Sequence, residues 1–288
     1  MTIQKVGVVG CGLMGSGIAQ VSAQAGFPTL VREATQALLD RGLASIRKFL
    51  EGGLEKGKLT QADVDRTLAN LRGTSQLDEF ADRDLVIEAV TENLGVKKEL
   101  LGTLDGLCGP QTIFASNTSS LSITEMSTFV KRPERVIGLH FFNPVPLMKL
   151  VEVVRTVRTD PAALEAAKTW CLALGKTPVS CGDSTGFVVN RLLVPYMLDA
   201  VRVFEQGLAS RDDIDNAMKL GCGYPMGPLL LTDYVGLDTT YSISEIMFAE
   251  FKEPRFAAPQ LLKRMVLAGL HGRKSGKGFY DWSTNPPS

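Results

Sequence analysis

Hydrophobic positions in the first 184 residues alternate between short apolar runs and helical stripes. The run Val6–Val9 is typical of a strand buried on both faces, and similar runs recur along this part of the chain. Between them, apolar residues three and four positions apart predict amphipathic helices, as over residues 37–50. Such alternation predicts a mostly parallel sheet with helices on both faces. The expected strands are Val6–Val9, Thr29–Val31, Leu85–Val90, Thr112–Ala115, Arg135–Leu139 and Lys149–Arg155, with a last one around Val179.

The pattern changes after Gly182, where strand patterns stop and long helical periods begin. Helices are expected over Phe187–Phe204, Asp212–Leu220, Leu237–Phe251 and Gln260–Leu270. We therefore predict two domains, a doubly wound α/β domain over residues 1–184 and an all-α domain over residues 185–288.

The helical domain carries more apolar residues than its size suggests. The runs Leu192–Val194 and Leu229–Leu231 are examples. Core packing explains part of this surplus, and a homodimer interface formed through this domain would explain the rest.

Composition excludes several classes of protein. The 288 residues include 31 basic and 31 acidic side chains, so a nucleic-acid partner is not expected. Five cysteines without a Cys-x-x-Cys pair favour a reduced compartment over a disulfide framework or a zinc site, and no metal site is expected. No run approaches the roughly 18 apolar residues of a membrane span, and no secretory leader is recognisable. We therefore expect a cytoplasmic protein.

A Gly-x-Gly-x-x-Gly motif at residues 10–15 follows the first strand and opens a helix. One glycine permits the tight turn, one lets the backbone approach a pyrophosphate, and one lets the helix pack on the strand. The helix N-terminus adds free N–H groups and positive partial charge. The motif predicts a Rossmann dinucleotide site, in which the cofactor lies against Gly10, Gly12, Leu13, Met14 and Gly15.

Glu33 follows the second strand, about twenty residues after the motif, where a carboxylate accepts the ribose hydroxyls of the adenosine. A carboxylate there repels a 2′-phosphate, which favours NAD over NADP. The preceding Arg32 leaves two interpretations open. Its side chain either leans on the adenine from the surface or accommodates a 2′-phosphate.

His140 and His271 are the only histidines, which narrows the search for a group that exchanges protons near neutral pH. His140 ends a predicted strand, and open α/β sheets bind ligands beyond the carboxyl ends of their strands. The turn over residues 141–146 can bring Glu152 beside it, where a carboxylate would fix the tautomer of the imidazole and raise its basicity. The alternative is a histidine with ordinary contacts and Glu152 as a surface charge.

Two polar segments offer further hydrogen-bonding groups. Residues 116–120, Ser-Asn-Thr-Ser-Ser, follow a strand, where hydroxyls can bind a substrate oxygen or simply form turns and caps. Asn190 lies in the first helix of the second domain, where it would face a cleft between domains or serve as an ordinary polar helix residue.

Seven stretches match one protein family in order and span nearly the whole chain, namely residues 10–19, 87–93, 115–121, 138–148, 186–191, 225–228 and 272–280. They include Gly-Cys-Gly-Leu-Met-Gly-Ser-Gly-Ile-Ala, Ala-Ser-Asn-Thr-Ser-Ser-Leu and Gly-Leu-His-Phe-Phe-Asn-Pro-Val-Pro-Leu-Met. Through them the chain resembles the 3-hydroxyacyl-CoA dehydrogenases, and especially the bacterial 3-hydroxybutyryl-CoA dehydrogenases. The resemblance implies reversible, NAD-dependent oxidation of a short-chain (3S)-3-hydroxyacyl-CoA, such as 3-hydroxybutyryl-CoA, to the 3-oxoacyl-CoA.

The resemblance also implies roles for single residues. His140 would be the general base and Glu152 its orienting partner, while Ser119 and Asn190 would bind the reacting oxygen or the thioester. The positions that match the family's cofactor contacts are Glu92, Lys97, Ser119, Asn143 and Lys274.

Ser45 and Lys56 match the region where the family contacts the CoA portion, and a solvated helix face is the alternative for both. Glu33 stands where the family usually has aspartate, which keeps the charge.

Two other hypotheses stay open: a dehydrogenase of a small free hydroxy acid, and a non-catalytic protein that keeps the fold. The intact base, partner and serine argue against the second.

Overall fold

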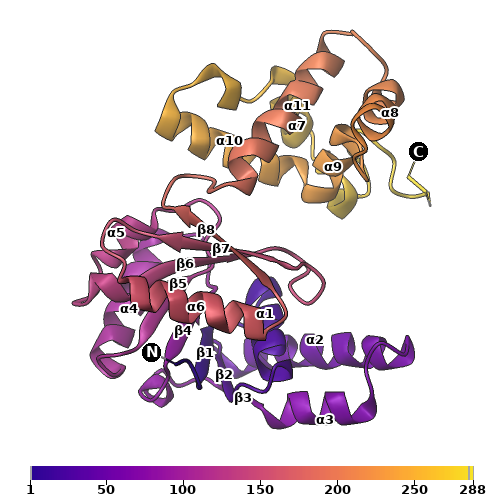
Figure 1. The fold of residues 1–288 in the computed structure, drawn as a ribbon. Helices are drawn as coiled ribbons and strands as arrows, with labels where there is room; N and C mark the ends of the chain where they lie inside the picture. The colour runs from indigo at the N-terminus through magenta and orange to yellow at the C-terminus, as the bar shows by residue number, and fades with distance from the viewer. Residues whose placement is uncertain (1, 285, 288) are drawn as a thin grey trace. The chain divides into compact units, whose positions relative to one another are not determined.

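The computed structural model describes residues 2–284, 286 and 287 and divides into two compact units. Unit 1 is Met1–Ser184 and unit 2 is Thr185–Ser288 (Figure 1). No helix in the described residues is long and apolar enough to cross a membrane.

Unit 1 is built on an eight-stranded sheet with the strand order β3-β2-β1-β4-β5-β6-β7-β8. The strands are β1 (Val6–Val9), β2 (Thr29–Arg32), β3 (Leu71–Thr74), β4 (Leu85–Glu88), β5 (Ile113–Ser116), β6 (Val136–Phe141), β7 (Leu150–Arg155) and β8 (Thr177–Gly182). All neighbours pair in parallel except β6 and β7, which are antiparallel. The predicted fold class, a mostly parallel Rossmann-like sheet followed by a helical part, is confirmed. β3 was not among the expected strands. Its residues Leu-Arg-Gly-Thr lack the apolar run that marks a buried strand.

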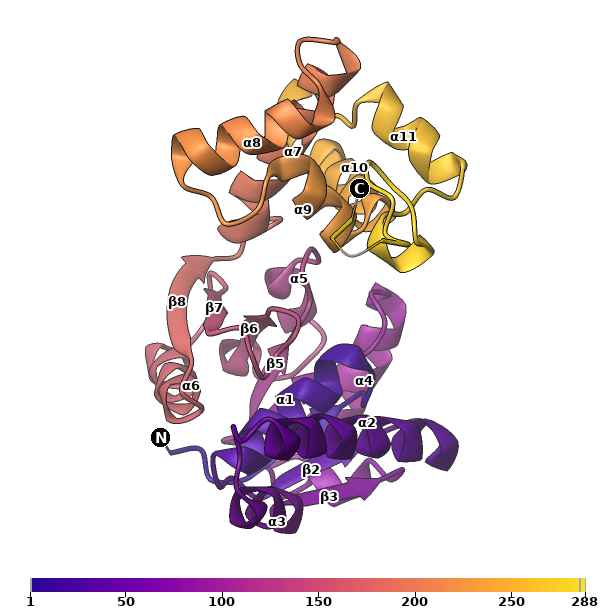
Figure 2. The same ribbon diagram turned by 90° about the vertical axis from the view of Figure 1, so that its right-hand side faces the viewer.

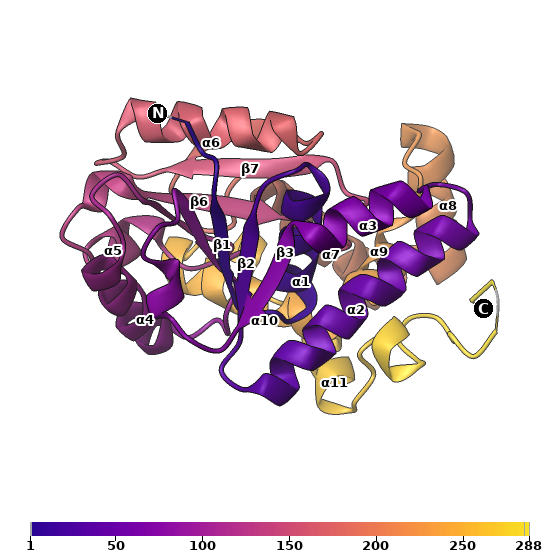
Figure 3. The same ribbon diagram turned by 90° about the horizontal axis from the view of Figure 1, so that it is seen from below.

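Six α-helices accompany the sheet in the described part of unit 1: α1 (Leu13–Gln24), α2 (Gln36–Glu55), α3 (Gln61–Ala69), α4 (Leu94–Leu107), α5 (Ile123–Ser127) and α6 (Pro161–Ala173). Two 3₁₀ turns, η1 (Asp78–Phe80) and η2 (Pro133–Arg135), join them. α2 and α3 lie side by side next to β3 (Figure 2), and α6 lies along β7 (Figure 3). Thr60 and Asp63 form a capping box at the start of α3, and the Asp160 side chain caps α6 before Pro161.

The two faces of the sheet are set by the alternation of side chains along each strand. On one face, Val8, Ile87, Leu139 and their equivalents join a buried apolar cluster with residues of α1 and α6. The next residue along a strand points to the other face, against which α5 packs on β6. Glu88 and His140 therefore belong to this second face.

Unit 2 is helical over its described residues. Its helices are α7 (Val189–Glu205), α8 (Arg211–Cys222), α9 (Pro228–Val235), α10 (Leu237–Phe251) and α11 (Gln260–Leu267), with 3₁₀ turns η3 (Pro254–Phe256) and η4 (Arg273–Ser275). α9 was not among the expected helices, because Gly227 precedes it and Pro228 is its first residue, and both residue types interrupt a helical pattern. Leu229 is fully buried in the core of this unit, and Leu230 and Leu231 pack against that core. Core packing thus accounts for this apolar run.

Candidate functional site

The glycine motif forms a tight turn between β1 and α1. Gly10 has φ +99°, which favours glycine, and a Cβ on it would lie 2.5 Å from the carbonyl oxygen of Ala89. A Cβ on Gly15 would overlap the carbonyl oxygen of Gly10. In contrast, a Cβ on Gly12 would meet no atom within 4 Å, so the space in front of this residue is open. The turn and the open N-terminus of α1 fit a pyrophosphate.

Glu33 lies beside this turn, at the end of β2. Its carboxylate accepts hydrogen bonds from the backbone N–H groups of Cys11 at 2.8 Å and Ala34 at 2.9 Å. It lines a cavity of about 370 Å³ together with Gly12, Leu13 and Arg41. The residues present therefore fit the adenosine end of a dinucleotide.

Two arginines lie near the cavity at Glu33, and only one of them lines it. The Nε of Arg32 donates a hydrogen bond to the carbonyl oxygen of Ser75 at 3.4 Å, and Arg32 is not part of the cavity wall. Arg41, on α2, lines the cavity instead. This second arginine was not predicted from the sequence, because its place depends on how α2 packs.

His140 and Glu152 face each other across β6 and β7. They are direct partners in the antiparallel register, and Nδ1 of His140 lies 2.7 Å from Oε2 of Glu152. Both are buried, with 6% of His140 and none of Glu152 exposed. The turn thus brings the two together as expected. His140 lies inside β6, however, because the strand continues through Phe141 rather than ending at Leu139.

The loop that carries Ser119 is held by hydrogen bonds to two neighbouring segments. The Glu92 carboxylate accepts bonds from the Ser119 N–H at 3.1 Å and from the Thr118 hydroxyl at 2.9 Å. The amide oxygen of Asn117 accepts a bond from the Phe141 N–H at 3.0 Å. The bond to Asn117 ties the loop to β6, the strand that contains His140.

Lys97 is buried beneath this loop in an ion pair that the sequence did not reveal. Its ammonium donates to both carboxylate oxygens of Glu88, at 2.7 and 2.8 Å, and lies 3.6 Å from Oε2 of Glu92. Only 1% of the Lys97 side chain and none of the Glu88 side chain are exposed. Glu88 lies in the matching stretch 87–93, and an acid that ends an otherwise apolar strand was the available sign of its role.

The segment after His140 is fixed by a buried lysine. Nζ of Lys176 donates to the carbonyl oxygens of Val145 at 2.6 Å and Met148 at 2.8 Å. Burial lowers the pKa of Lys176 from its ordinary value.

Asn143 precedes a cis peptide bond to Pro144, and both line a small cavity of about 80 Å³ with Leu13 of the glycine motif.

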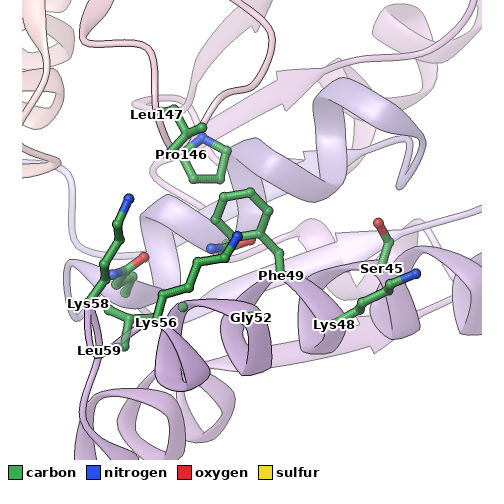
Figure 4. Close-up of a pocket in the computed structure, with 12 residues that line it drawn as sticks. Ser45, Lys48, Phe49, Gly52, Lys56, Lys58, Leu59, Pro146 and Leu147 are labelled. Carbon is green, nitrogen blue, oxygen red and sulfur yellow. The ribbon is translucent and has the colours of Figure 1, made fainter. Parts of the chain in front are cut away.

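Ser45 and Lys56 line a larger cavity of about 620 Å³ (Figure 4). Lys48 and Lys58 add positive charge to its wall. Figure 4 shows Lys56 and Lys58 just beyond the end of α2, below Pro146 and Leu147, with Ser45 and Lys48 earlier in the helix. Three ammonium groups beside an apolar wall suit an anionic ligand with an apolar part.

The two remaining expected site residues belong to unit 2. Asn190 lies in the first turn of α7 and is half-buried. Lys274 lies in η4, and its Nζ donates to Oδ2 of Asp238 at 2.6 Å. Within the described ranges, no group of three or more His, Cys, Asp or Glu side chains is placed to hold a metal ion.

Comparison with known proteins identifies the family. The model of the 3-hydroxyacyl-CoA dehydrogenase NAD binding domain matches residues 5–184, and that of the 3-hydroxyacyl-CoA dehydrogenase C-terminal domain matches residues 186–282. A 3-hydroxybutyryl-CoA dehydrogenase of Mycobacterium tuberculosis is 52% identical over 284 residues, which are 97% of this chain and 99% of that protein. The mitochondrial hydroxyacyl-coenzyme A dehydrogenase of Sus scrofa is 46% identical over 287 residues, 97% of this chain and 91% of that one.

Solved structures agree with these matches. The crystal structure of (S)-3-hydroxybutyryl-CoA dehydrogenase from Ralstonia eutropha superposes with a TM-score of 0.95 at 43% identity, and the match covers 98% of this chain and 100% of that one. Both family models, the relatives and the shared fold lead to one assignment. The chain belongs to the 3-hydroxyacyl-CoA dehydrogenase family and is an NAD-dependent dehydrogenase.

Proposed function

We propose that this enzyme reversibly oxidises a short-chain (3S)-3-hydroxyacyl-CoA, such as 3-hydroxybutyryl-CoA, to the 3-oxoacyl-CoA. The observation that carries the proposal is the buried contact of 2.7 Å between His140 and Glu152, on the face of the sheet opposite the apolar cluster formed with α1 and α6. The names of the bacterial relatives support the short acyl chain.

His140 is the general base of the proposed reaction. If its Nδ1–H donates to Glu152, Nε2 is the nitrogen that accepts the proton of the 3-hydroxyl group. Glu152 holds this tautomer and stabilises the imidazolium that forms. NAD, when bound, accepts the hydride from C3 of the substrate. In the reverse direction the protonated His140 returns the proton to the oxygen.

Other groups orient the two reactants. Ser119 and Asn190 donate hydrogen bonds to the reacting oxygen and so stabilise its changing charge. The glycine motif receives the pyrophosphate and Glu33 the adenosine ribose, where its charge opposes a 2′-phosphate. Glu92, Lys97, Ser119, Asn143 and Lys274 complete the cofactor contacts that we propose.

The cavity lined by Ser45 and Lys56 is the proposed site of the CoA portion. The charges of Lys48, Lys56 and Lys58 match the phosphates of CoA, and the apolar wall at Leu147 suits the rest of an elongated thioester. The small cavity at Asn143 and Pro144 shares Ser45 and Phe49 with this one and extends to the glycine motif.

The oxidation of NADH in the presence of acetoacetyl-CoA tests the proposed reaction. We expect turnover of acetoacetyl-CoA and negligible turnover of free acetoacetate, because the free acid lacks the groups that the lysines bind. NADPH in place of NADH should react much more slowly because of Glu33. Equal turnover of the free acid would instead favour a dehydrogenase of small hydroxy acids, and no turnover of either would favour a non-catalytic relative.

We also propose a homodimer formed through unit 2. Leu192, Leu208 and Leu220 are 70%, 76% and 85% exposed. An apolar cavity of about 400 Å³ on the same unit, lined by Leu208 and Met218, adds unpartnered surface. Light scattering should give twice the chain mass of 31.1 kDa, and the monomer mass would contradict the dimer.

A further inference from the structure

We propose that Glu88 is a positioning residue of the cofactor site and acts through Lys97. By holding the Lys97 ammonium, Glu88 sets the place of Glu92 and of the loop that presents Ser119. The inference rests on the proposed function in one respect, since that proposal makes Glu92, Lys97 and Ser119 cofactor contacts.

Glu88 lies where three strands of the sheet end together. It pairs with Val9, the last residue of β1 before the glycine motif, and with Ser116, the last residue of β5. The Ser116 hydroxyl donates to its carboxylate, and the Val90 N–H lies 3.3 Å from Oε2. A single carboxylate therefore connects the ends of β4 and β5 beside the point where the glycine motif begins.

Stability alone is a weak explanation for the Glu88–Lys97 pair. Removing both charges from water is costly, and an apolar pair of similar volume is often equally stable or more stable. The pair is nevertheless almost wholly buried. A function in orienting neighbouring groups accounts for two charges at this place, because a buried and fully bonded ion pair fixes geometry well.

From this pair a chain of contacts leads to Ser119. The Lys97 ammonium lies between Glu88 and Glu92, closer to Glu88. Glu92, whose side chain is 43% exposed, in turn holds the Ser119 N–H and the Thr118 hydroxyl. Ser116, which donates to Glu88, accepts a bond from the Thr118 N–H at 3.2 Å. The loop that presents Ser119 is thus connected to Glu88 by two routes, one through Lys97 and Glu92 and the other through Ser116.

Loss of the Glu88 charge should disturb this chain in a defined direction. The ammonium would be left with Glu92 as its nearest carboxylate and would be drawn toward it. Glu92 would then release the Thr118 hydroxyl and the Ser119 N–H, which compete for the same oxygens. The loop would lose its fixed position, and the cofactor would bind to a less ordered site.

A double-mutant cycle on NADH affinity tests the inference, with fluorescence titration of Glu88→Gln, Lys97→Met and the double variant. We expect Glu88→Gln alone to raise the Kd for NADH about tenfold or more, as the loss of one charged hydrogen bond does. In the Lys97→Met background the same change should alter the Kd less than about twofold, because its route of action is already gone.

Asp105→Asn serves as the matched control. Asp105 lies on α4, as Lys97 does, is 7% exposed, and binds the Lys131 N–H and the Arg132 guanidinium. This variant should unfold at a lower temperature and bind NADH normally. The melting temperature of each variant separates a loss of stability from a loss of affinity.

Two results would overturn the inference. One is an unchanged NADH Kd in Glu88→Gln, and the other is an independent, multiplying effect of the two substitutions. If Glu88→Gln does not fold, Glu88→Asp takes its place in the cycle, since it keeps the charge but draws the carboxylate away from the Lys97 ammonium, and the same criteria apply to its smaller effect. Because the readout is NADH binding, failure of acetoacetyl-CoA turnover would contradict the proposed function and leave this test intact.

Discussion

The two faces of the sheet in unit 1 differ sharply at neighbouring positions of the same strands. On one face Ile87, Ala115 and Leu139 lie in the apolar core with α1 and α6. The next residues along β4, β5 and β6 are Glu88, Ser116 and His140, and all three are buried polar groups with polar partners. A step of one residue thus leads from the core to the candidate site. Stability and chemistry should therefore be separable by substitution of adjacent residues.

The largest effect is expected on the polar face, in His140→Gln. Without the proposed base, kcat for acetoacetyl-CoA reduction should fall about 10²–10⁴-fold, while the Kd for NADH stays near the wild-type value. Steady-state kinetics and fluorescence titration measure the two quantities. Near-normal turnover in this variant would show that the polar face does not carry the proposed base, and would contradict the distinction between the two faces.

The adjacent substitution Leu139→Ala should act on stability instead. Leu139 is fully buried, and truncation of such a leucine costs about 2–5 kcal/mol in the free energy of unfolding because it leaves a cavity. Urea denaturation measures the cost. The folded fraction should keep its KM for both reactants, and a large rise in either KM would show that the apolar face also shapes the site.

A smaller effect is expected where the site extends beyond the sheet, in Lys56→Ala. Loss of one exposed ammonium should raise the KM for acetoacetyl-CoA about two- to fivefold and leave the NADH affinity unchanged. Added salt should reduce the difference from wild type. Lys219→Ala, an exposed lysine of α8 in unit 2, is the control. An equal rise in both variants would argue against a CoA site in this cavity.

The smallest effect is expected in Asp63→Asn at the start of α3, outside both faces. Hydrogen bonds from the Thr60 side chain and backbone hold the pKa of Asp63 below its ordinary value. A lowered pKa contributes stability above the unfolded-state pKa, and this contribution is lost as the pH falls through the folded-state pKa. The variant should melt slightly below wild type at neutral pH, and the difference should vanish in acid. Thermal melts from pH 7 to pH 2 measure it, and a difference that is independent of pH would contradict this account.

Local patterns were enough to predict most of the fold. The strand-helix order and the glycine motif depend on residues close together in the sequence, and so does the antiparallel turn that joins His140 to Glu152. β3 escaped prediction because its stability comes from pairing with β2 rather than from its own residues. α9 escaped prediction because it has only eight residues, follows a glycine and begins with a proline.

Long-range packing explains what the sequence did not reveal about the site. The place of Lys176 depends on a segment 28 and 31 residues away, and the wall of the cavity at Lys56 is completed by Pro146 and Leu147. Ser45 and Lys56 were assigned only through the family resemblance, which carries such packing implicitly. The importance of Glu88 also required the position of Lys97.

The most direct test of the central claim is the single-turnover rate of NADH oxidation by acetoacetyl-CoA in His140→Gln, Glu152→Gln and the double variant. If Glu152 acts by orienting His140, its loss should slow the wild-type reaction and have almost no further effect once His140 is absent. Independent, multiplying effects of the two substitutions would contradict the account.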